Sequence, residues 1–265
     1  MKLIIELEHV TYQRGTHLIL QDLSFTIMEN EHCALLGLNG SGKTTLLNMI
    51  NGYIWPSRGK VRVLGHPFGS TNLPELRKSI GWVSSSFQER IHPTELAQEI
   101  VISGKYASIG LYEDITQEDI DSSIALLERV DCLHLANRPY SACSQGEKQK
   151  ILIARALMSN PDLLILDEPC TGLDLFAREQ LLSLVEGLCD LPSGPTLLYV
   201  THHTEEIIPC FKHALLLKSG QLYNHGETKK LLTSSTLSSF FDQQVHVHWQ
   251  QERPYVSIER SVHAT

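Results

Sequence analysis

An eight-residue stretch, 37–44, places three glycines, a lysine and a threonine within one short loop. Its sequence, Gly-Leu-Asn-Gly-Ser-Gly-Lys-Thr, fits the Gly-x-x-x-x-Gly-Lys-Thr pattern of loops that bind phosphate groups. Glycines let the backbone curl around phosphates because no Cβ stands in the way. We expect Lys43 to reach the β- and γ-phosphates, and the Thr44 hydroxyl to ligate Mg²⁺. The sequence therefore predicts a site for a nucleoside triphosphate.

The segments on either side of this loop have the periodicity that such a site requires. Residues 32–36 form a short apolar run typical of a buried strand, and residues 44–50 favour a helix that ends at Gly52. The helix N-terminus would then present free backbone N–H groups and the positive end of its dipole to phosphate. The residues expected to contact the nucleotide here are Gly37, Asn39, Gly40, Ser41, Gly42, Lys43, Thr44 and Thr45.

A second chemical cluster follows the aliphatic run 163–166, where Asp167 and Glu168 stand side by side. Parallel strands of α/β sheets deliver functional side chains at their carboxyl ends. Asp167 is suited to hold Mg²⁺, directly or through water, together with Thr44. Glu168 is suited to polarise the attacking water as a general base. The alternative is a carboxylate pair that merely ends a strand, which the accompanying phosphate loop disfavours.

Composition excludes several other classes of protein. The 265 residues are 42% hydrophobic and 20% charged, which is ordinary for a globular domain. A net charge of −8 argues against general nucleic-acid binding. The sequence has no N-terminal secretory signal and no apolar run of about 18 residues, so no direct membrane insertion is expected. The six cysteines include no C-x-x-C pair, which is typical of reduced, mostly buried cysteines in a cytosolic protein.

Strands and helices alternate along most of the chain, which predicts an α/β fold with a mostly parallel sheet. Strands are expected over residues 3–12, 23–27, 60–64, 80–84, 163–166, 196–201 and a last one at 214–218. Helices are expected over residues 73–78, 94–103, 145–157 and 176–188, with a further helix starting at Thr116. We interpret the chain as a single domain, 1–265, with a phosphate-loop NTPase core formed by 1–88 and 160–235. The core includes an N-terminal antiparallel β subdomain, and residues 89–159 form an inserted helical lobe.

The tail is expected to be less regular after residue 232. Alternating residues at 245–249 and 255–258 predict a small β-hairpin within the C-terminal extension, 236–265. His246 and His248 fall on one face of its first strand. Because neither a carboxylate nor a thiol accompanies them, we interpret both as surface residues rather than as metal ligands.

The segment Cys143-Ser144-Gln145-Gly146-Glu147, which opens the helix 145–157, resembles the signature of the ATP-binding cassette (ABC) family, usually Leu-Ser-Gly-Gly-Gln. The resemblance covers residues 12–232, and the motifs follow the family's order. It identifies Tyr12 as the aromatic residue that stacks on adenine. It identifies Gln88 as the glutamine that senses Mg²⁺ and the transport partner, and Asp174 as part of the D-loop. His202, directly after Tyr199-Val200-Thr201, resembles the switch histidine that contacts the γ-phosphate.

The signature differs from the family pattern because Cys143 replaces the usual leucine and Gln145 the first glycine. Ser144 and Gly146 remain, and the resemblance implies that the segment 144–147 contacts the γ-phosphate with a hydroxyl and a backbone N–H. A helix of 13 residues is about 20 Å long, so Ser144 lies far from the end that leads to Asp167 and is not expected to meet the phosphate held by its own loop. The resemblance to the family implies that the signature completes the site of a second chain. Two chains would pack head to tail with two ATP molecules between them.

The resemblance implies an ATPase subunit of an ABC transporter, working as a homodimer or with a paired subunit. ATP and Mg²⁺ are the implied cofactors, and a separate membrane permease would dock on residues 89–104 at the cytoplasmic face of the cell membrane. Residues 103–112 and the tail resemble stand-alone bacterial subunits grouped with molybdate- or metal-type importers. One alternative is a non-transport ABC ATPase of iron–sulfur assembly or translation, although the translation type usually has two cassettes and a charged linker. The other is a phosphate-loop kinase, which the signature at 144–147 disfavours.

Overall fold

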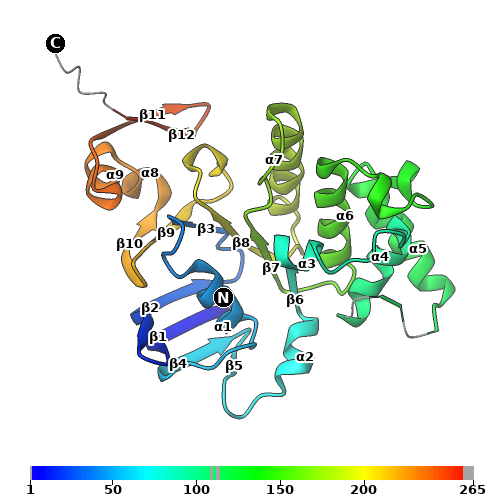
Figure 1. Ribbon diagram of the computed structural model, residues 1–265, viewed down its shortest axis with the longest axis horizontal. Coiled ribbons are helices and arrows are strands. Elements are labelled where there is room, and N and C mark those ends of the chain that lie inside the picture. The colour runs from blue at the N-terminus through cyan, green and yellow to red at the C-terminus, as the bar shows by residue number, and fades with distance from the viewer. Residues whose placement is uncertain (1, 108–109, 112–113, 259–265) are drawn as a thin grey trace. The chain divides into compact units, whose positions relative to one another are not determined.

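The computed structural model describes residues 2–107, 110–111 and 114–258. Ser108, Ile109 and Tyr112, which contributed to the importer resemblance, lie outside the described residues. The described chain divides into two compact units, the first formed by residues 1–67 and 199–265 and the second by residues 68–198 (Figure 1). Each unit is described in turn.

The first unit begins with an antiparallel sheet. Its strands are β1 (Leu3–Arg14), β2 (His17–Met28), β4 (Arg58–Val63) and β5 (His66–Pro67), in the order β2-β1-β4-β5. Leu23, Phe25 and Ile27 of β2 are buried while the residues between them are exposed, as expected for a sheet with one face in the core. The expected N-terminal antiparallel subdomain is confirmed.

The same unit contains the strand that leads into the phosphate loop. All five residues of β3 (Cys33–Gly37) are buried, and β3 runs parallel to β9 (His213–Lys218). An all-buried aliphatic strand is what a parallel sheet covered on both faces requires. Helix α1 (Lys43–Ile50) follows the loop, and β8 (Thr196–Thr201) carries the chain from the second unit into the first. The expected α/β fold with a mostly parallel sheet is confirmed.

Regular structure continues beyond the strand at 214–218, so the expectation that this strand is the last of the sheet is wrong. β10 (Gln221–Glu227) pairs antiparallel with β9, and its mostly exposed polar residues hid it from a search for apolar alternation. The remaining elements are α8 (Thr228–Leu231), α9 (Ser234–Phe241), β11 (Val245–Gln250) and β12 (Arg253–Ile258). β11 and β12 pair as an antiparallel hairpin, in which the ring of His248 stacks on Tyr255.

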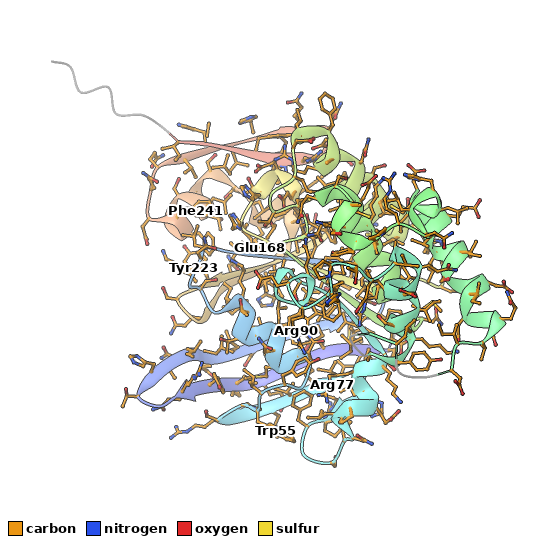
Figure 2. The ribbon with its side chains drawn as sticks, turned by 45° about the vertical axis from the view of Figure 1, so that its right-hand side comes forward. Trp55, Arg77, Arg90, Glu168, Tyr223 and Phe241 are labelled. Carbon is orange, nitrogen blue, oxygen red and sulfur yellow. The ribbon has the colours of Figure 1, made fainter. Side chains whose placement is uncertain are left out.

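Helix α9 was not expected from its serine-rich sequence. Thr233 caps the helix through its side-chain oxygen, which accepts a hydrogen bond from the N–H of Thr236. Phe240 is buried, and its ring centroid lies 5.5 Å from that of Tyr223 on β10 and 5.0 Å from that of Phe241. Figure 2 labels Tyr223 and Phe241 on these two elements. A few aromatic contacts therefore order a segment whose composition indicates a loop.

The second unit contains a parallel strand pair and a group of helices. β6 (Ile80–Val83) runs parallel to β7 (Leu163–Asp167). The helices are α2 (Leu73–Lys78), α3 (Ser85–Gln88), α4 (Ala97–Ser103), α5 (Gln117–Arg129), α6 (Gln145–Leu157) and α7 (Leu175–Cys189). Short 3₁₀ turns lie at Gly104–Tyr106, Leu133–Leu135 and Tyr140–Ala142 in this unit and at Thr204–Glu206 in the first. Within the part of the chain that the structure describes, no helix is long and apolar enough to cross a membrane.

Helices α4, α5 and α6 pack together in one cluster (Figure 1). Gly104 allows the close approach at the end of α4, since a Cβ there would lie 1.9 Å from the carbonyl oxygen of Arg155 on α6. The buried Arg155 donates a hydrogen bond from Nε to Ser103 Oγ at 3.2 Å. The carboxylate of Asp119, 1% exposed at its side chain, is held by the Lys105 ammonium, which lowers the pKa of Asp119 well below its usual range. The contacts of Arg155 hold α6, the helix that carries the signature, against the end of α4, and the Asp119–Lys105 pair joins that end to α5.

Candidate functional site

The phosphate loop joins buried β3 to helix α1, as its sequence predicts. The ammonium of Lys43 points back into the loop, where Nζ donates to the carbonyl oxygens of Gly37 at 2.7 Å and Leu38 at 3.3 Å. Gly37 has no room for a side chain, because a Cβ would lie 2.6 Å from Ser41 Oγ. The loop thus curls around a lysine head group, which is the positive charge that a phosphate would meet.

Helix α1 begins without a side-chain cap. Its N-cap is Gly42 at φ 102°, whereas Thr116, Ser144 and Asp174 cap α5, α6 and α7 with side-chain oxygens. The first N–H groups of a helix lack partners within the helix and need an acceptor. Ser41 Oγ is also buried and has no hydrogen-bond partner among the described residues. An anion bound here would accept hydrogen bonds from these groups.

The phosphate loop is supported by a neighbouring turn, and Thr44 at its end offers a ligand for a metal ion. The N–H of Gly220, in the turn between β9 and β10, donates to the Ser41 carbonyl oxygen at 2.9 Å. A Cβ on Gly220 would lie 2.1 Å from the Ile19 carbonyl oxygen, so glycine is required at this support. The sequence alone gave no indication of this role of Gly220. Thr44 is exposed at the start of α1, and its hydroxyl oxygen is a suitable ligand for Mg²⁺.

The carboxylate pair lies at the carboxyl end of β7, as the sequence predicts. Asp167 and Glu168 are half-buried after four fully buried aliphatic residues. Glu168, labelled in Figure 2, has a φ of 50°, the left-handed region that a non-glycine residue adopts at a cost. Eleven other non-glycine residues of the described chain also have a positive φ, so the position of Glu168 at the end of β7 carries more weight than its backbone angle. Asp174 lies farther along, where its carboxylate caps α7 by accepting from the Ala177 N–H at 2.9 Å.

The signature segment forms a rigid, exposed corner at the start of α6. Ser144 Oγ accepts from the Glu147 N–H at 3.3 Å, and Glu147 Oε2 accepts from the Ser144 N–H at 2.7 Å. This reciprocal capping box lowers the pKa of the Glu147 carboxyl, chiefly through the backbone hydrogen bond from Ser144. Cys143 is buried where the family pattern has leucine, and burial raises the pKa of its thiol. Ser144 itself is exposed.

Gln88 lies within hydrogen-bond distance of this corner, a contact that sequence analysis did not anticipate. Gln88 Nε2 donates to Gln145 Oε1 at 3.1 Å, and Gln145 Nε2 donates back to Gln88 Oε1 at 3.3 Å. Gln149, one turn along α6, also donates to Gln88 Oε1 at 3.1 Å. The spacing of Gln145 and Gln149 places both on one face of α6, but nothing in the sequence places Gln88 beside them.

The two remaining candidates belong to the first unit. Tyr12 is half-buried on β1, opposite Leu20 of β2. His202 directly follows β8, and its ring lies 4.2 Å from that of His203. The loop after β8 is held by Glu206, a buried carboxylate that sequence analysis missed, which accepts from Thr201 Oγ1 at 2.7 Å and from the Tyr199 hydroxyl at 3.1 Å.

The candidates thus fall into two groups. The phosphate loop, Tyr12 and His202 belong to the first unit, whereas Gln88, the signature, the carboxylate pair and Asp174 belong to the second. Among the described residues, no three or more His, Cys, Asp or Glu side chains gather in a way that could hold a metal ion by themselves. A metal ion here would need hydroxyl, amide or phosphate oxygens in addition to a carboxylate.

A buried parallel strand, a glycine-rich loop and a helix without a side-chain cap follow one another here. This arrangement defines a phosphate-loop NTPase of the α/β class. Comparison with known proteins narrows this class. A family model described as "ABC transporter" matches residues 20–171. The chain belongs to this family, whose ATP-binding subunits bind ATP.

Individual ABC proteins are similar to this chain over most of its length. The ABC transporter ATP-binding protein YlmA of Bacillus subtilis (strain 168) is 49% identical over 256 residues, covering 96% of this chain and 97% of YlmA. The molybdate import ATP-binding protein MolC of Haemophilus influenzae is 31% identical, covering 87% of this chain and 84% of MolC. The dimeric ATP-binding cassette MJ0796, in a post-hydrolysis state with ADP and phosphate, matches with a TM-score of 0.72 and 26% identity, covering 85% of this chain and 99% of the cassette.

Proposed function

We propose that this chain is the ATP-hydrolysing subunit of an ABC transporter, and that it energises a separate membrane permease through ATP-driven closure of a dimer. The observation that carries the proposal is the start of α1. There a helix N-terminus without a side-chain cap adjoins the Lys43 ammonium inside a glycine loop, in a chain of the ABC family. The positive charge and the N–H groups of the first helical turn suit a triphosphate.

Each predicted residue has one role in this proposal. Lys43 and the N–H groups from Asn39 to Thr45 hold the phosphates, and Tyr12 stacks on adenine. Thr44, Asp167 and Gln88 would hold Mg²⁺ through hydroxyl, carboxylate and amide oxygens, and the ion would neutralise charge that develops on the phosphates. Glu168 accepts the proton of the attacking water, and His202 contacts the γ-phosphate. The exposure of Thr44 and the position of Glu168 directly after β7 support these roles.

The signature acts in a second copy of the chain. Ser144 is exposed at the N-terminus of α6, so its hydroxyl and the N–H of Gly146 are accessible to a nucleotide held by a partner. Gln145, Glu147 and Asp174 belong to the same surface in the family's arrangement. The dimer reported for MJ0796 supports this arrangement. A paired ABC subunit could replace the second copy.

The permease would dock on residues 89–104 of the inserted lobe, 89–159, which holds the protein at the inner face of the cell membrane. The similarity to MolC, a molybdate import ATP-binding protein, supports an importer as the kind of transporter that this chain serves. No comparison favours the alternative of a non-transport ABC ATPase. Purification of the tagged chain from membranes tests this part. A co-purifying permease is expected, whereas ribosomes or a scaffold protein in its place would contradict the proposal.

The hydrolytic role is tested with Glu168→Gln, which keeps the size of the side chain and removes the base. We expect ATP binding to persist, turnover to fall by about 10² to 10⁴-fold, and a dimer to accumulate with ATP in size-exclusion chromatography. Glu186→Gln, a surface change on α7, is the matched control and should leave turnover unchanged. Wild-type turnover in Glu168→Gln would remove Glu168 from the role of base.

A further inference from the structure

The carboxamide of Gln88 is hydrogen-bonded at both of its polar atoms. Its oxygen accepts from two N–H donors, Gln145 Nε2 at 3.3 Å and Gln149 Nε2 at 3.1 Å. Its nitrogen donates to Gln145 Oε1 at 3.1 Å. A carbonyl oxygen has two lone pairs, so both acceptor positions of Gln88 are in use. A metal ion can bind an amide only through this oxygen, and these hydrogen bonds compete with it.

The side chains of Gln145 and Gln149, which hydrogen-bond to Gln88, differ in how easily they can move away from it. Gln149 is 4% exposed, and its own Oε1 is buried with no partner among the described residues, so packing fixes this side chain in place. Gln145 is exposed as the first residue of α6. Water or a ligand can therefore replace the hydrogen bonds of Gln145 at small cost, whereas Gln149 is expected to remain where it is.

The backbone beside Gln88 is also tied to α6. The guanidinium of Arg155 lies 3.9 Å from the ring centroid of Phe87, the residue before Gln88. The Gln88 N–H and the Phe87 N–H both donate to the Ser84 carbonyl oxygen, at 3.2 Å and 3.1 Å. Gln88 is thus held on a short helix that is anchored independently of Gln145, and only the orientation of its side chain depends on the amide pair.

We propose that Gln145 is a positioning residue that restrains Gln88. By pairing with the Gln88 carboxamide, Gln145 keeps the Gln88 oxygen from binding Mg²⁺ until the start of α6 contacts a second copy of the chain. The proposal rests on the role given above to Gln88. Gln145 adjoins Ser144, so a nucleotide that binds the Ser144 corner disturbs the pair directly. The usual family residue at this position, glycine, has no side chain and cannot form the pair.

The first test measures how ATP hydrolysis by the full chain depends on Mg²⁺ concentration. Gln145→Ala should lower the half-saturating Mg²⁺ concentration by about threefold, since about one net hydrogen bond no longer competes. Gln117→Ala is the matched control, because Gln117 also opens a 13-residue helix behind a side-chain N-cap and a capping box. It should leave the Mg²⁺ dependence unchanged, which separates the loss of the pair from a change in helix propensity.

A third variant separates failure of this inference from failure of the proposed function. Gln88→Ala should raise the half-saturating Mg²⁺ concentration. If Gln88→Ala raises it while Gln145→Ala has no effect, the restraint is overturned and the role of Gln88 stands. If Gln88→Ala has no effect either, the proposed role of Gln88 and the restraint are both overturned.

A second readout is independent of catalysis. In ¹⁵N-glutamine-labelled protein without nucleotide, the side-chain NH₂ signal of Gln88 should shift in Gln145→Ala and stay in place in Gln117→Ala. Addition of Mg²⁺ and ATP to Glu168→Gln should move the Gln88 and Gln145 signals together. A Gln88 signal that ignores Gln145→Ala would show that the pair does not form in solution and would overturn the proposal, whatever the ATPase result.

Discussion

The phosphate loop and the signature corner are both short segments at a helix N-terminus, yet they are built differently. Around the loop, Gly42 leaves α1 without a side-chain cap, so the helix end is open to an anion. At the corner, Ser144 and Glu147 cap α6 with their own side chains, and Gln145 pairs with Gln88. The open end suits the site that holds the nucleotide, and the closed end suits a surface that meets a nucleotide held elsewhere.

This difference predicts how each segment responds to mutation. The loop depends on the Lys43 ammonium and on its backbone N–H groups, so loss of the ammonium should greatly weaken ATP binding. The corner depends on several side chains whose contributions can be separated from one another. The three predictions that follow test this contrast, starting with the largest effect.

Lys43→Ala should weaken ATP binding by at least about 100-fold, because it removes charge-assisted hydrogen bonds to two phosphate groups. Isothermal titration calorimetry measures the affinity, and circular dichroism verifies that the variant is folded. Lys78→Ala, at an exposed lysine that pairs with Glu75, is the control and should bind ATP normally. Unchanged affinity in Lys43→Ala would refute the assignment of the loop.

Ser144→Asn should leave ATP affinity near the wild-type value and reduce turnover by about 10- to 100-fold. Asparagine caps helices as well as serine does, so α6 keeps its N-cap while the hydroxyl is lost. A mixture of the Ser144→Asn and Lys43→Ala chains should be more active than either chain alone, because one site of the mixed dimer combines an intact loop with an intact signature. A mixture no more active than the sum of its parts would argue against completion by a second copy.

Replacing Glu147 should have a smaller effect, a change in thermal stability that depends on pH. Its folded-state pKa is lowered from an ordinary value of 4.5, so its carboxylate stabilises the fold above that pH and loses this effect as the pH falls through the lowered pKa. Glutamine also fits a capping box but carries no charge. At pH 7 the wild type should therefore melt about 1–2 °C above Glu147→Gln, and the difference should shrink below pH 4.5. A difference that stays constant over this range would contradict the role of the charge.

The parts of the fold that the sequence predicted are those that local pattern determines. The loop, the buried strand before it and the aliphatic run before Asp167 could be predicted because glycine spacing and hydrophobic periodicity specify them. The strand β10 and helix α9 could not, since their order depends on pairing with β9 and on the Phe240 contacts. Tertiary contacts of this kind override local composition.

In the candidate site, too, local sequence pattern explains some features and only the fold reveals others. Besides Gln145, which replaces a glycine of the family pattern, Glu147 stands where the pattern has glutamine. The capping box explains this second difference, because glutamate and glutamine both serve at that position. The Gln88–Gln145 pair joins residues 57 positions apart, and no local pattern could indicate it. Likewise, the support of Ser41 by Gly220 became visible only in the fold.

The most direct test of the central claim is a crystal structure of Glu168→Gln with ATP and Mg²⁺. The account predicts a dimer in which the triphosphate held by Lys43 of one copy lies within hydrogen-bond distance of Ser144 Oγ of the other copy. A structure with ATP bound at the loop, but with Ser144 exposed to solvent or facing its own chain's nucleotide, would contradict the account.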